Sequence, residues 1–187
     1  MKPWSHAKPH EEIKVGWRYL VRKTFIDPTG QEQEYVTLAR LGTQCVATIA
    51  LTPDGQVVIA EQFRVGPEKI MQEIPGGLVD DGESIEGAAR RELHEETGYT
   101  AEKMIYLGEV FKDAYSNATW HFFLAEGCTA DARQHTDAGE YIEIKLITID
   151  QLFDNARNGR MTDIEAVFLA YEQLNSVNGG ISHEATN

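Results

Sequence analysis

The sequence has few of the features that mark specialised classes of protein. It contains two cysteines, Cys45 and Cys128, among 187 residues, which is too few for a disulfide framework or a four-ligand zinc site. It has no run of about 18 apolar residues, so we expect no membrane-spanning helix. The first residues, MKPWSH, contain no apolar segment of the kind found in a secretory signal. These absences favour a reducing, cytoplasmic location.

Positive charge is also scarce. Lys and Arg number 17 against 30 Asp and Glu, and the net charge is −13. A protein that binds duplex nucleic acid needs a basic surface to neutralise phosphates, so nucleic acid is excluded as a partner. A small phosphate-containing ligand remains compatible with this charge, provided that a cation stands between the two. The length and the 42% hydrophobic content are ordinary for one soluble folded domain.

Strand signals dominate the chain. Segments rich in branched and aromatic residues predict strands at residues 13–26, 34–41, 45–51, 56–62, 104–111, 119–125 and 141–149. Turn sequences lie between the early strands, DPTG at 27–30 and TPDG at 52–55, and each favours a tight connection. Many strands with few helices predict an α/β fold in which helices cover the faces of a mixed sheet.

Helical signals occur at three places. Residues 84–97 have helical composition without proline. Asp150 is expected to cap a short helix that ends at Asn155, and Thr162 or Asp163 is expected to cap a last helix. In that last helix apolar residues recur at helical spacing, at Ile164, Val167, Phe168 and Tyr171.

On the helix predicted at 84–97, acidic residues lie on the same face as the apolar residues that are expected to pack against the core. The apolar stripe consists of Ile85, Ala88 and Ala89, and its continuation consists of Glu92 and Glu96 at positions i and i+4. Two stacked carboxylates repel each other and lose hydration near a core, so a positive group is expected between them. A hard divalent cation such as Mg²⁺ or Mn²⁺ suits such oxygen ligands.

Three neighbouring residues complete this predicted metal site. Glu95 lies on the flank of the stripe and can add an oxygen, while Arg91 stands four residues before it and can hold it in place. Before the helix, Gly76 and Gly77 allow the backbone to approach a ligand closely, and the carbonyl of Gly76 is a further candidate ligand. The alternative is that an acidic helix is simply a solvated face, which the shared position of the acids on the apolar stripe opposes.

The loop and the helix carry a recognisable motif. From Gly77 the sequence reads Gly, five residues, Glu83, seven residues and then RELHEETGY at 91–99. This spacing resembles the Nudix box, and every defining position is filled. The resemblance implies the Nudix fold, a mixed β-sheet sandwiched between helices (α/β/α) with an N-terminal antiparallel β extension. The implied domains are a β-hairpin arm at 1–42, the Nudix domain at 43–176 and a polar tail at 177–187.

In Nudix proteins the box binds divalent cations and hydrolyses a nucleoside diphosphate linked to another group. The resemblance therefore implies that Glu92 and Glu96 are the main metal ligands, with Glu95 a further ligand or a catalytic group. The other implied roles are the Gly76 carbonyl as a ligand, Arg91 as the group that orients the glutamates, and Glu83 as support for the loop–helix geometry. Mg²⁺ is the implied cofactor, with Mn²⁺ as an alternative.

The sequences around the box resemble those of ADP-ribose and nucleoside-diphosphate-sugar pyrophosphatases. The matching segments are EQFR at 61–64 and EIPGGLVDDGE at 73–83. In that subfamily the strand arginine contacts the diphosphate, which implies this role for Arg64, and Glu73 joins it as a candidate substrate-binding residue. The subfamily also exchanges an N-terminal sheet between two subunits. This implies a homodimer and makes Trp17 a candidate for stacking on the base.

One departure from the subfamily leaves the substrate open. Many ADP-ribose hydrolases have a proline shortly after the box, and residues 112–118 (KDAYSNA) contain none. A nucleoside diphosphate hexose such as GDP-mannose is therefore as good a candidate as ADP-ribose. Either small-molecule substrate would give a nucleoside monophosphate and a sugar phosphate. Tyr115, Ser116 and Asn117 are candidates to line the sugar pocket, against the alternative of an ordinary polar loop.

In that subfamily the catalytic base is often an acid on a loop after the box, so the resemblance implies a base in the segment 126–140, where Glu140 is the first candidate. Its rivals are Asp137, Glu143 and Glu95, and the weaker candidates are His121 and His135. Two other functions remain open: a nucleoside triphosphate pyrophosphatase that uses the same box, and a non-catalytic Nudix-like module that senses a nucleotide sugar. The complete set of box glutamates opposes the second of these.

Overall fold

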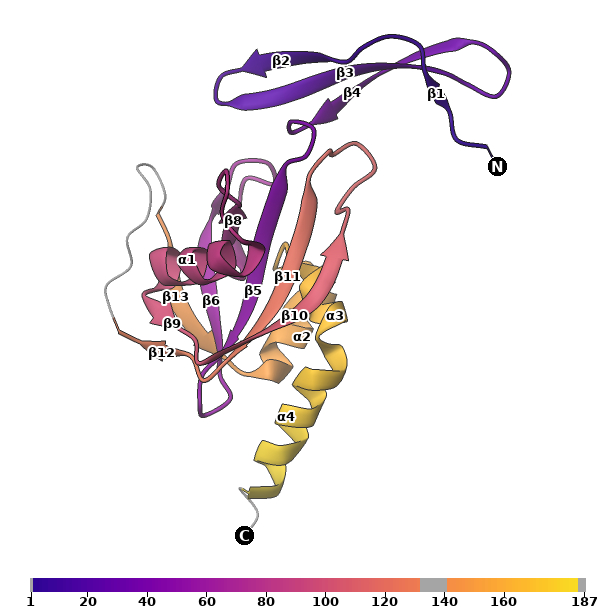
Figure 1. Ribbon diagram of the computed structural model, residues 1–187. Helices are drawn as coiled ribbons and strands as arrows, with labels where there is room; N and C mark the ends of the chain where they lie inside the picture. The colour runs from indigo at the N-terminus through magenta and orange to yellow at the C-terminus, as the bar shows by residue number, and fades with distance from the viewer. Residues whose placement is uncertain (1, 132–140, 185–187) are drawn as a thin grey trace. The chain divides into compact units, whose positions relative to one another are not determined.

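The computed structural model describes residues 2–131 and 141–184, with side chains described as far as residue 179. The chain divides into two units (Figure 1). The first, which we call the arm unit, contains Met1–Gln44 and Phe111–Trp120, and the second, the sheet unit, contains Cys45–Val110 and His121–Asn187. No helix in the described part of the chain is long and apolar enough to cross a membrane.

The arm unit is built around one long central strand. Its strands are β1 (Ser5–His6), β2 (Glu11–Val15), β3 (Arg18–Ile26) and β4 (Glu32–Leu38), and β3 pairs antiparallel with each of the others. The prediction of a single strand over 13–26 is wrong, because Gly16, at φ 61°, reverses the chain and divides the segment. The DPTG turn is confirmed: the Asp27 carboxylate accepts hydrogen bonds from the backbone N–H groups of Thr29 (2.8 Å) and Gln31 (3.1 Å).

A second stretch of chain completes the arm unit. The N–H of Leu38 donates to the carbonyl of Tyr115 (2.7 Å), and the N–H of Asn117 donates to the carbonyl of Leu38 (2.8 Å). These bonds attach the connection between β10 (Lys103–Val110) and β11 (Thr119–Glu126) to the end of β4. The arm unit is therefore assembled from two segments that lie far apart in the sequence.

The sheet unit is organised by a seven-stranded sheet in the order β10-β11-β5-β6-β13, with β7 beside β6 and β8 beside β5. Its other strands are β5 (Gln44–Leu51), β6 (Val57–Arg64), β7 (Lys69–Glu73), β8 (Gly76–Leu78) and β13 (Glu143–Ile147), and β9 (Tyr99–Thr100) pairs separately with β12 (Thr129–Ala130). The sequence predicts the longer strands, whereas β7 and β8 are short and were not predicted.

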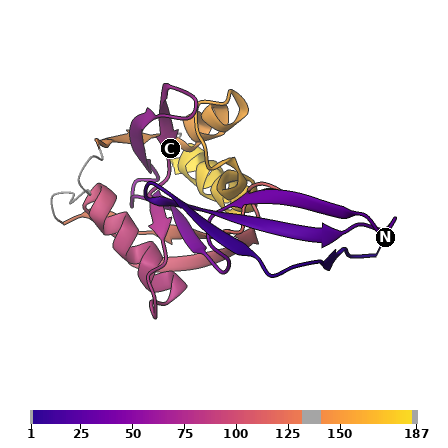
Figure 2. The same ribbon diagram turned by 90° about the horizontal axis from the view of Figure 1, so that it is seen from above.

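Helices cover both faces of this sheet, as Figures 1 and 2 show. One face carries α1 (Ile85–Thr97), and the other carries α2 (Ile149–Arg157), α3 (Ile164–Leu169) and α4 (Tyr171–Glu184). Successive residues of a strand point to opposite faces. In β5, Val46 packs with Ala88 and Ala89 of α1, and Ile49, on the opposite face, is also fully buried. The predicted α/β/α arrangement with an N-terminal antiparallel extension is confirmed.

The C-terminal helices differ from the prediction in their boundaries. α2 begins at Ile149 and is capped by the hydroxyl of Thr148, so Asp150 lies within the first turn and is not the cap. The last helix is divided into α3 and α4, and Asp163 at the start of α3 makes no side-chain capping hydrogen bond. Phe168 is 81% exposed. The apolar residues of this segment therefore do not all face the core.

Candidate active site

Helix α1 has well-defined ends. The hydroxyl of Ser84 accepts a hydrogen bond from the N–H of Gly87 (3.0 Å). At the other end Gly98, at φ 73°, donates its N–H to the carbonyl of His94 (2.7 Å). A serine N-cap and a left-handed glycine are common helix boundaries. The helix predicted at 84–97 is confirmed.

The inward face of α1 changes from apolar to acidic, as predicted. Ala88 and Ala89 are fully buried, and Leu93 is 1% exposed. Further along the same side of the helix, Glu96 is 8% exposed and the side chain of Glu92 is 14% exposed. These two carboxylates are thus largely removed from water, and the interpretation of a simple solvated face is wrong for them.

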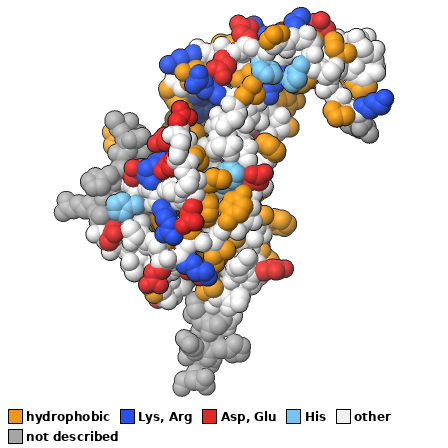
Figure 3. All heavy atoms as spheres, in the orientation of Figure 1, with side chains coloured by type: hydrophobic (Ala, Val, Ile, Leu, Met, Phe, Trp, Pro, Cys, Tyr) orange, Lys and Arg blue, Asp and Glu red, His pale blue; other side chains and the backbone are white. Residues whose placement is uncertain are grey.

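Arg91 lies at the centre of the acidic residues. Its guanidinium donates two hydrogen bonds to Glu83 (both 3.1 Å) and one each to Glu92 (2.9 Å) and Glu95 (3.0 Å). Another bond reaches the carbonyl of Leu78 (2.9 Å). The bond to Glu83 is the main reason that the pKa of Arg91 is raised, and it also lowers the pKa of Glu83. Figure 3 shows acidic and basic side chains side by side over α1.

Two glycines allow β8 to lie against α1. The N–H of Gly76 donates to the carboxylate of Glu96 (2.9 Å). A Cβ on Gly76 would lie 2.3 Å from a backbone carbonyl oxygen of β5, and a Cβ on Gly77 would lie 2.3 Å from a carboxylate oxygen of Glu92. Both glycines belong to strand β8. The two glycines thus allow close contacts with β5 and with Glu92, and the predicted approach to a ligand stays a prediction.

The chemistry of this carboxylate set suits a hard divalent cation. Glutamate and backbone carbonyl oxygens are the donors that Mg²⁺ and Mn²⁺ prefer. Among the described His, Cys, Asp and Glu side chains, no three are arranged as metal ligands; Arg91 bonds an oxygen of Glu92 and an oxygen of Glu95. A carboxylate has a second oxygen and further lone pairs. The residues present therefore fit a cation by donor type, although Glu92 and Glu95 bond Arg91 and Glu96 bonds the N–H of Gly76.

A second charged pair connects β6 and β7. Arg64 donates to Glu73 through Nε (2.5 Å) and through Nη2, and Glu73 is 5% exposed. This bond raises the pKa of Arg64, and the charges of Glu96 and Asp163 raise it further. Of the residues of α1, Glu96 is the one whose charge contributes to this shift. Asp163 is 5% exposed and was identified from the sequence only as a helix cap.

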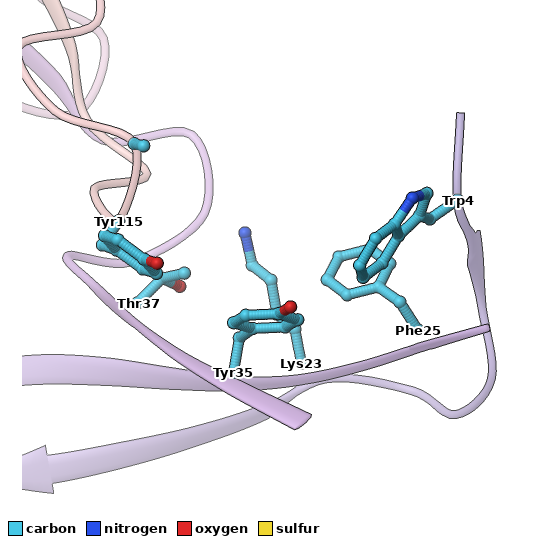
Figure 4. Close-up of a pocket in the computed structure, with 7 residues that line it drawn as sticks. Trp4, Lys23, Phe25, Tyr35, Thr37 and Tyr115 are labelled. Atoms are coloured by element: carbon cyan, nitrogen blue, oxygen red, sulfur yellow. The ribbon is translucent and has the colours of Figure 1, made fainter. Parts of the chain in front are cut away.

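The arm unit contains a separate aromatic pocket (Figure 4). Its walls are Trp4, Phe25, Tyr35 and Tyr115, with Lys23 and Thr37 between them, around a cavity of about 410 Å³. Sequence reasoning singled out Tyr115 but missed the others. These residues come from four separate parts of the chain, and no motif connects them.

The remaining candidates for the substrate site also lie in the arm unit. Asn117 accepts a hydrogen bond from Lys23, whereas the hydroxyl of Ser116 accepts one from the N–H of Ala118 (3.1 Å). Trp17 is 80% exposed, and the guanidinium of Arg18 lies 4.5 Å from its ring centre. Trp17 and Ser116 are not among the residues that line the aromatic pocket.

The candidates for the catalytic base are only partly placed. Glu140, Asp137 and His135 lie outside the described residues. Glu143 is exposed on β13. His121 is 4% exposed, and its Nδ1 lies 3.0 Å from the hydroxyl oxygen of Tyr106. His121 is therefore built into the interior of the sheet unit.

Replacing Arg91 by Lys tests its central position. A lysine keeps the charge but lacks the planar fork that bonds several partners at once. We expect a loss of about 1–2 kcal/mol in the free energy of unfolding, or about 2–8 °C in Tm. Thermal unfolding measures it. The matched control is Arg90→Lys, because Arg90 pairs with the exposed Glu86; equal Tm values for both variants would contradict the prediction.

Comparison with known proteins agrees with this geometry. The NUDIX domain family matches residues 43–169. An ADP-ribose pyrophosphatase of Bacillus subtilis (strain 168) is 31% identical over 132 residues, which cover 69% of this chain and 71% of that protein. A GDP-mannose pyrophosphatase of Yersinia enterocolitica is 28% identical over 181 residues, which cover 89% of this chain and 94% of that protein.

A solved structure supports the fold. The crystal structure of an ADP compounds hydrolase matches with a TM-score of 0.79 at 19% identity, covering 94% of this chain and 96% of that chain. The family match spans more than half of the sequence and includes β8, α1 and the glutamates around Arg91. The chain belongs to the NUDIX domain family.

Proposed function

We propose that this chain hydrolyses the pyrophosphate bond of a nucleoside diphosphate sugar or ADP-ribose. The reaction depends on a divalent metal and gives a nucleoside monophosphate and a sugar phosphate. The observation that carries the proposal is a group of glutamates at the Nudix motif. Glu83, Glu92 and Glu95 accept hydrogen bonds from Arg91, and Glu96 accepts one from the N–H of Gly76. One relative is named for an ADP substrate and another for a GDP substrate. Both names support the reaction, and they do not decide between adenine and guanine as the nucleotide base.

In this proposal the sheet unit holds the metal and the diphosphate. The groups that would hold Mg²⁺, or Mn²⁺ as an alternative, are Glu92, Glu95, Glu96 and the carbonyl of Gly76. Such a cation, when bound, neutralises phosphate oxygens and lowers the pKa of water. Glu73 fixes the guanidinium of Arg64 through two hydrogen bonds. The other N–H groups of Arg64 then bind diphosphate oxygens.

Hydrolysis also needs a group that accepts a proton from the attacking water. Glu140 is the proposed base, with Asp137 and Glu143 as rivals from the same part of the chain. Glu95 is a further rival, because it lies on α1 with its side chain 45% exposed. Replacing each of these acids by its amide identifies the base. A general base works only when it is deprotonated, so its loss removes the acidic limb of the pH–rate profile, where the rate falls as the base becomes protonated.

In this proposal the arm unit supplies the pocket for the nucleotide base of the substrate. Aromatic side chains offer flat surfaces for stacking a planar ring. This proposal assigns Tyr115 to the nucleotide base, whereas the sequence made Tyr115, Ser116 and Asn117 candidates for the sugar pocket. Exchange of the arm between two copies would form the homodimer that the resemblance implies. The exposed ring of Trp17 is then a further stacking surface.

The partners and location follow from composition. The net charge of −13 supports a small-molecule substrate and opposes nucleic acid. The low cysteine content supports a cytoplasmic location. Fractionation of the source cells and a measurement of mass in solution test the location and the dimer.

A substrate panel tests the proposed reaction. The purified chain is incubated with Mg²⁺ or Mn²⁺ and equal concentrations of ADP-ribose, GDP-mannose and GTP, and the products are separated by anion exchange. We expect nucleoside monophosphate and sugar phosphate from the diphosphates, and no turnover without metal. A preference for GTP would favour a triphosphate pyrophosphatase, and binding without turnover would favour a sensor.

A further inference from the structure

The aromatic pocket of the arm unit surrounds one positive charge. The ring centre of Tyr35 lies 6.1 Å from that of Trp4 and 6.4 Å from that of Phe25. Figure 4 shows the amino group of Lys23 rising between Tyr115 and the Trp4–Phe25 pair. Flat apolar surfaces around a cation suit a planar ring that carries hydrogen-bond acceptors.

Asn117 fixes the direction of the Lys23 ammonium group. Lys23 Nζ donates to Asn117 Oδ1. Asn117 Nδ2 donates to the hydroxyl of Thr37 (2.9 Å) and to the carbonyl of Ala39 (2.8 Å). Because both amide hydrogens have protein acceptors, the oxygen of Asn117 faces Lys23. An ammonium group has three hydrogens and no lone pair, so toward the cavity Lys23 can only donate.

Nucleotide bases differ in what they present to such a donor. Guanine carries two adjacent acceptors, O6 and N7, and a lysine can donate to both. Adenine places an amino group beside N7, and this donor would face the ammonium group of Lys23. A site built to hydrogen-bond one ligand rejects an analogue that leaves its polar groups unpaired. The hydroxyls of Tyr35 and Tyr115 both donate and accept, so they do not discriminate.

We propose that Lys23 selects guanine over adenine, by donating to O6 and N7 of a base stacked in this pocket. The inference rests on the proposed function, which leaves the base open. It makes a GDP-linked sugar a better substrate than the same sugar linked to ADP. Lys23 is then a specificity-determining residue that is distinct from the glutamates of α1.

Two substrates that differ only in the base test the role of Lys23. We expect kcat/KM for GDP-glucose to exceed that for ADP-glucose by about 10- to 100-fold, which is typical for a paired donor at the guanine edge. Lys23→Met keeps the length of the side chain and removes the ammonium group. The ratio should fall to about one, through a higher KM for GDP-glucose with little change in kcat. Lys23→Arg keeps donors and should retain the preference.

Lys8→Met is the matched control. Lys8 also belongs to the arm unit, is exposed and pairs with Glu32 (2.7 Å), and it does not line the pocket. It should leave the kinetics of both substrates unchanged, and thermal unfolding shows whether each variant is folded. Calorimetric binding of GMP and AMP to the metal-free protein gives a second readout, which does not depend on hydrolysis.

The outcomes separate this inference from the proposed function. Tighter binding of GMP than of AMP, lost in Lys23→Met, supports the role of Lys23 even if no sugar nucleotide is hydrolysed; the absence of hydrolysis would contradict only the proposed function. Hydrolysis of both substrates with the same ratio in Lys23→Met overturns the role of Lys23 alone. Equal weakening of GMP, AMP and ribose 5-phosphate would show that the ammonium group binds phosphate, and would also overturn it.

Discussion

Replacing Glu96 by Gln is expected to lower metal-dependent hydrolysis by about 10²- to 10³-fold without unfolding the protein. Glu96 is buried on α1 and accepts a hydrogen bond from the N–H of Gly76 (2.9 Å). A glutamine keeps an oxygen that can accept this bond, so the contact between β8 and α1 remains. The change removes a negative charge that would hold the cation, and the cation contributes several kcal/mol to stabilisation of the transition state.

Glu86→Gln is the matched control for this change. Glu86 lies on the same helix, its side chain is 54% exposed, and it pairs with Arg90 at a spacing of i,i+4. Such a pair contributes only about 0.2–0.5 kcal/mol, so the control should retain nearly full activity. Steady-state hydrolysis and calorimetric titration with Mn²⁺ compare the two variants. A fully active Glu96→Gln protein would refute the assignment of α1 as the metal-binding helix.

Replacing Gly77 by Ala is expected to lower activity by about 10²-fold while the protein stays folded. The new Cβ would lie 2.3 Å from Oε1 and 2.5 Å from Cδ of Glu92. These atoms are at the end of a flexible side chain, so Glu92 can move aside at small cost to stability. The displaced carboxylate no longer takes its place in the donor set, and a shift of about 1 Å at a reacting group can cost this much.

Gly76→Ala provides a contrast one residue away. Its Cβ would lie 2.3 Å from the carbonyl oxygen of Val46 and 2.7 Å from the Cα of Ala47. Backbone atoms within a sheet cannot move aside as a side chain does, so we expect a loss of about 3 kcal/mol in stability and a fall of about 6–12 °C in Tm. Thermal unfolding and initial rates separate the two variants. If Gly77→Ala lost stability as Gly76→Ala does, the contact with Glu92 would not be the cause.

The parts of the site that could be predicted are those whose sequence pattern lies within one short segment of the chain. The ends of α1 and the sequence of acidic residues after the apolar stripe lie within one short segment. A cap such as Ser84, a terminal glycine such as Gly98 and a periodic pattern can be recognised there without knowledge of the fold. For the same reason the tight turns at 27–30 and 52–55 could be predicted.

The contacts that were missed depend on how separate segments pair, whether these are neighbours or far apart in the sequence. The bond between Arg64 and Glu73 requires the register of β6 against β7, and β7 is too short to give a clear pattern. Lys23 and Asn117 are 94 residues apart, and neither belongs to a motif. Gly16 divides a segment that otherwise has strand composition throughout, and an isolated glycine in such a segment is a weak signal.

The assembly of the arm unit from two stretches of chain limits how it can be altered or transplanted. Backbone bonds join Leu38 to Tyr115 and Asn117, and the side chain of Asn117 orients Lys23. Deleting the first stretch would leave the second without its partners. Grafting the first stretch, residues 1–44, onto another protein would omit Tyr115, which lines one side of the aromatic pocket. Changes in either stretch must therefore be compensated in the other, so we expect the two to covary among homologues although most of the sheet's strands separate them in sequence.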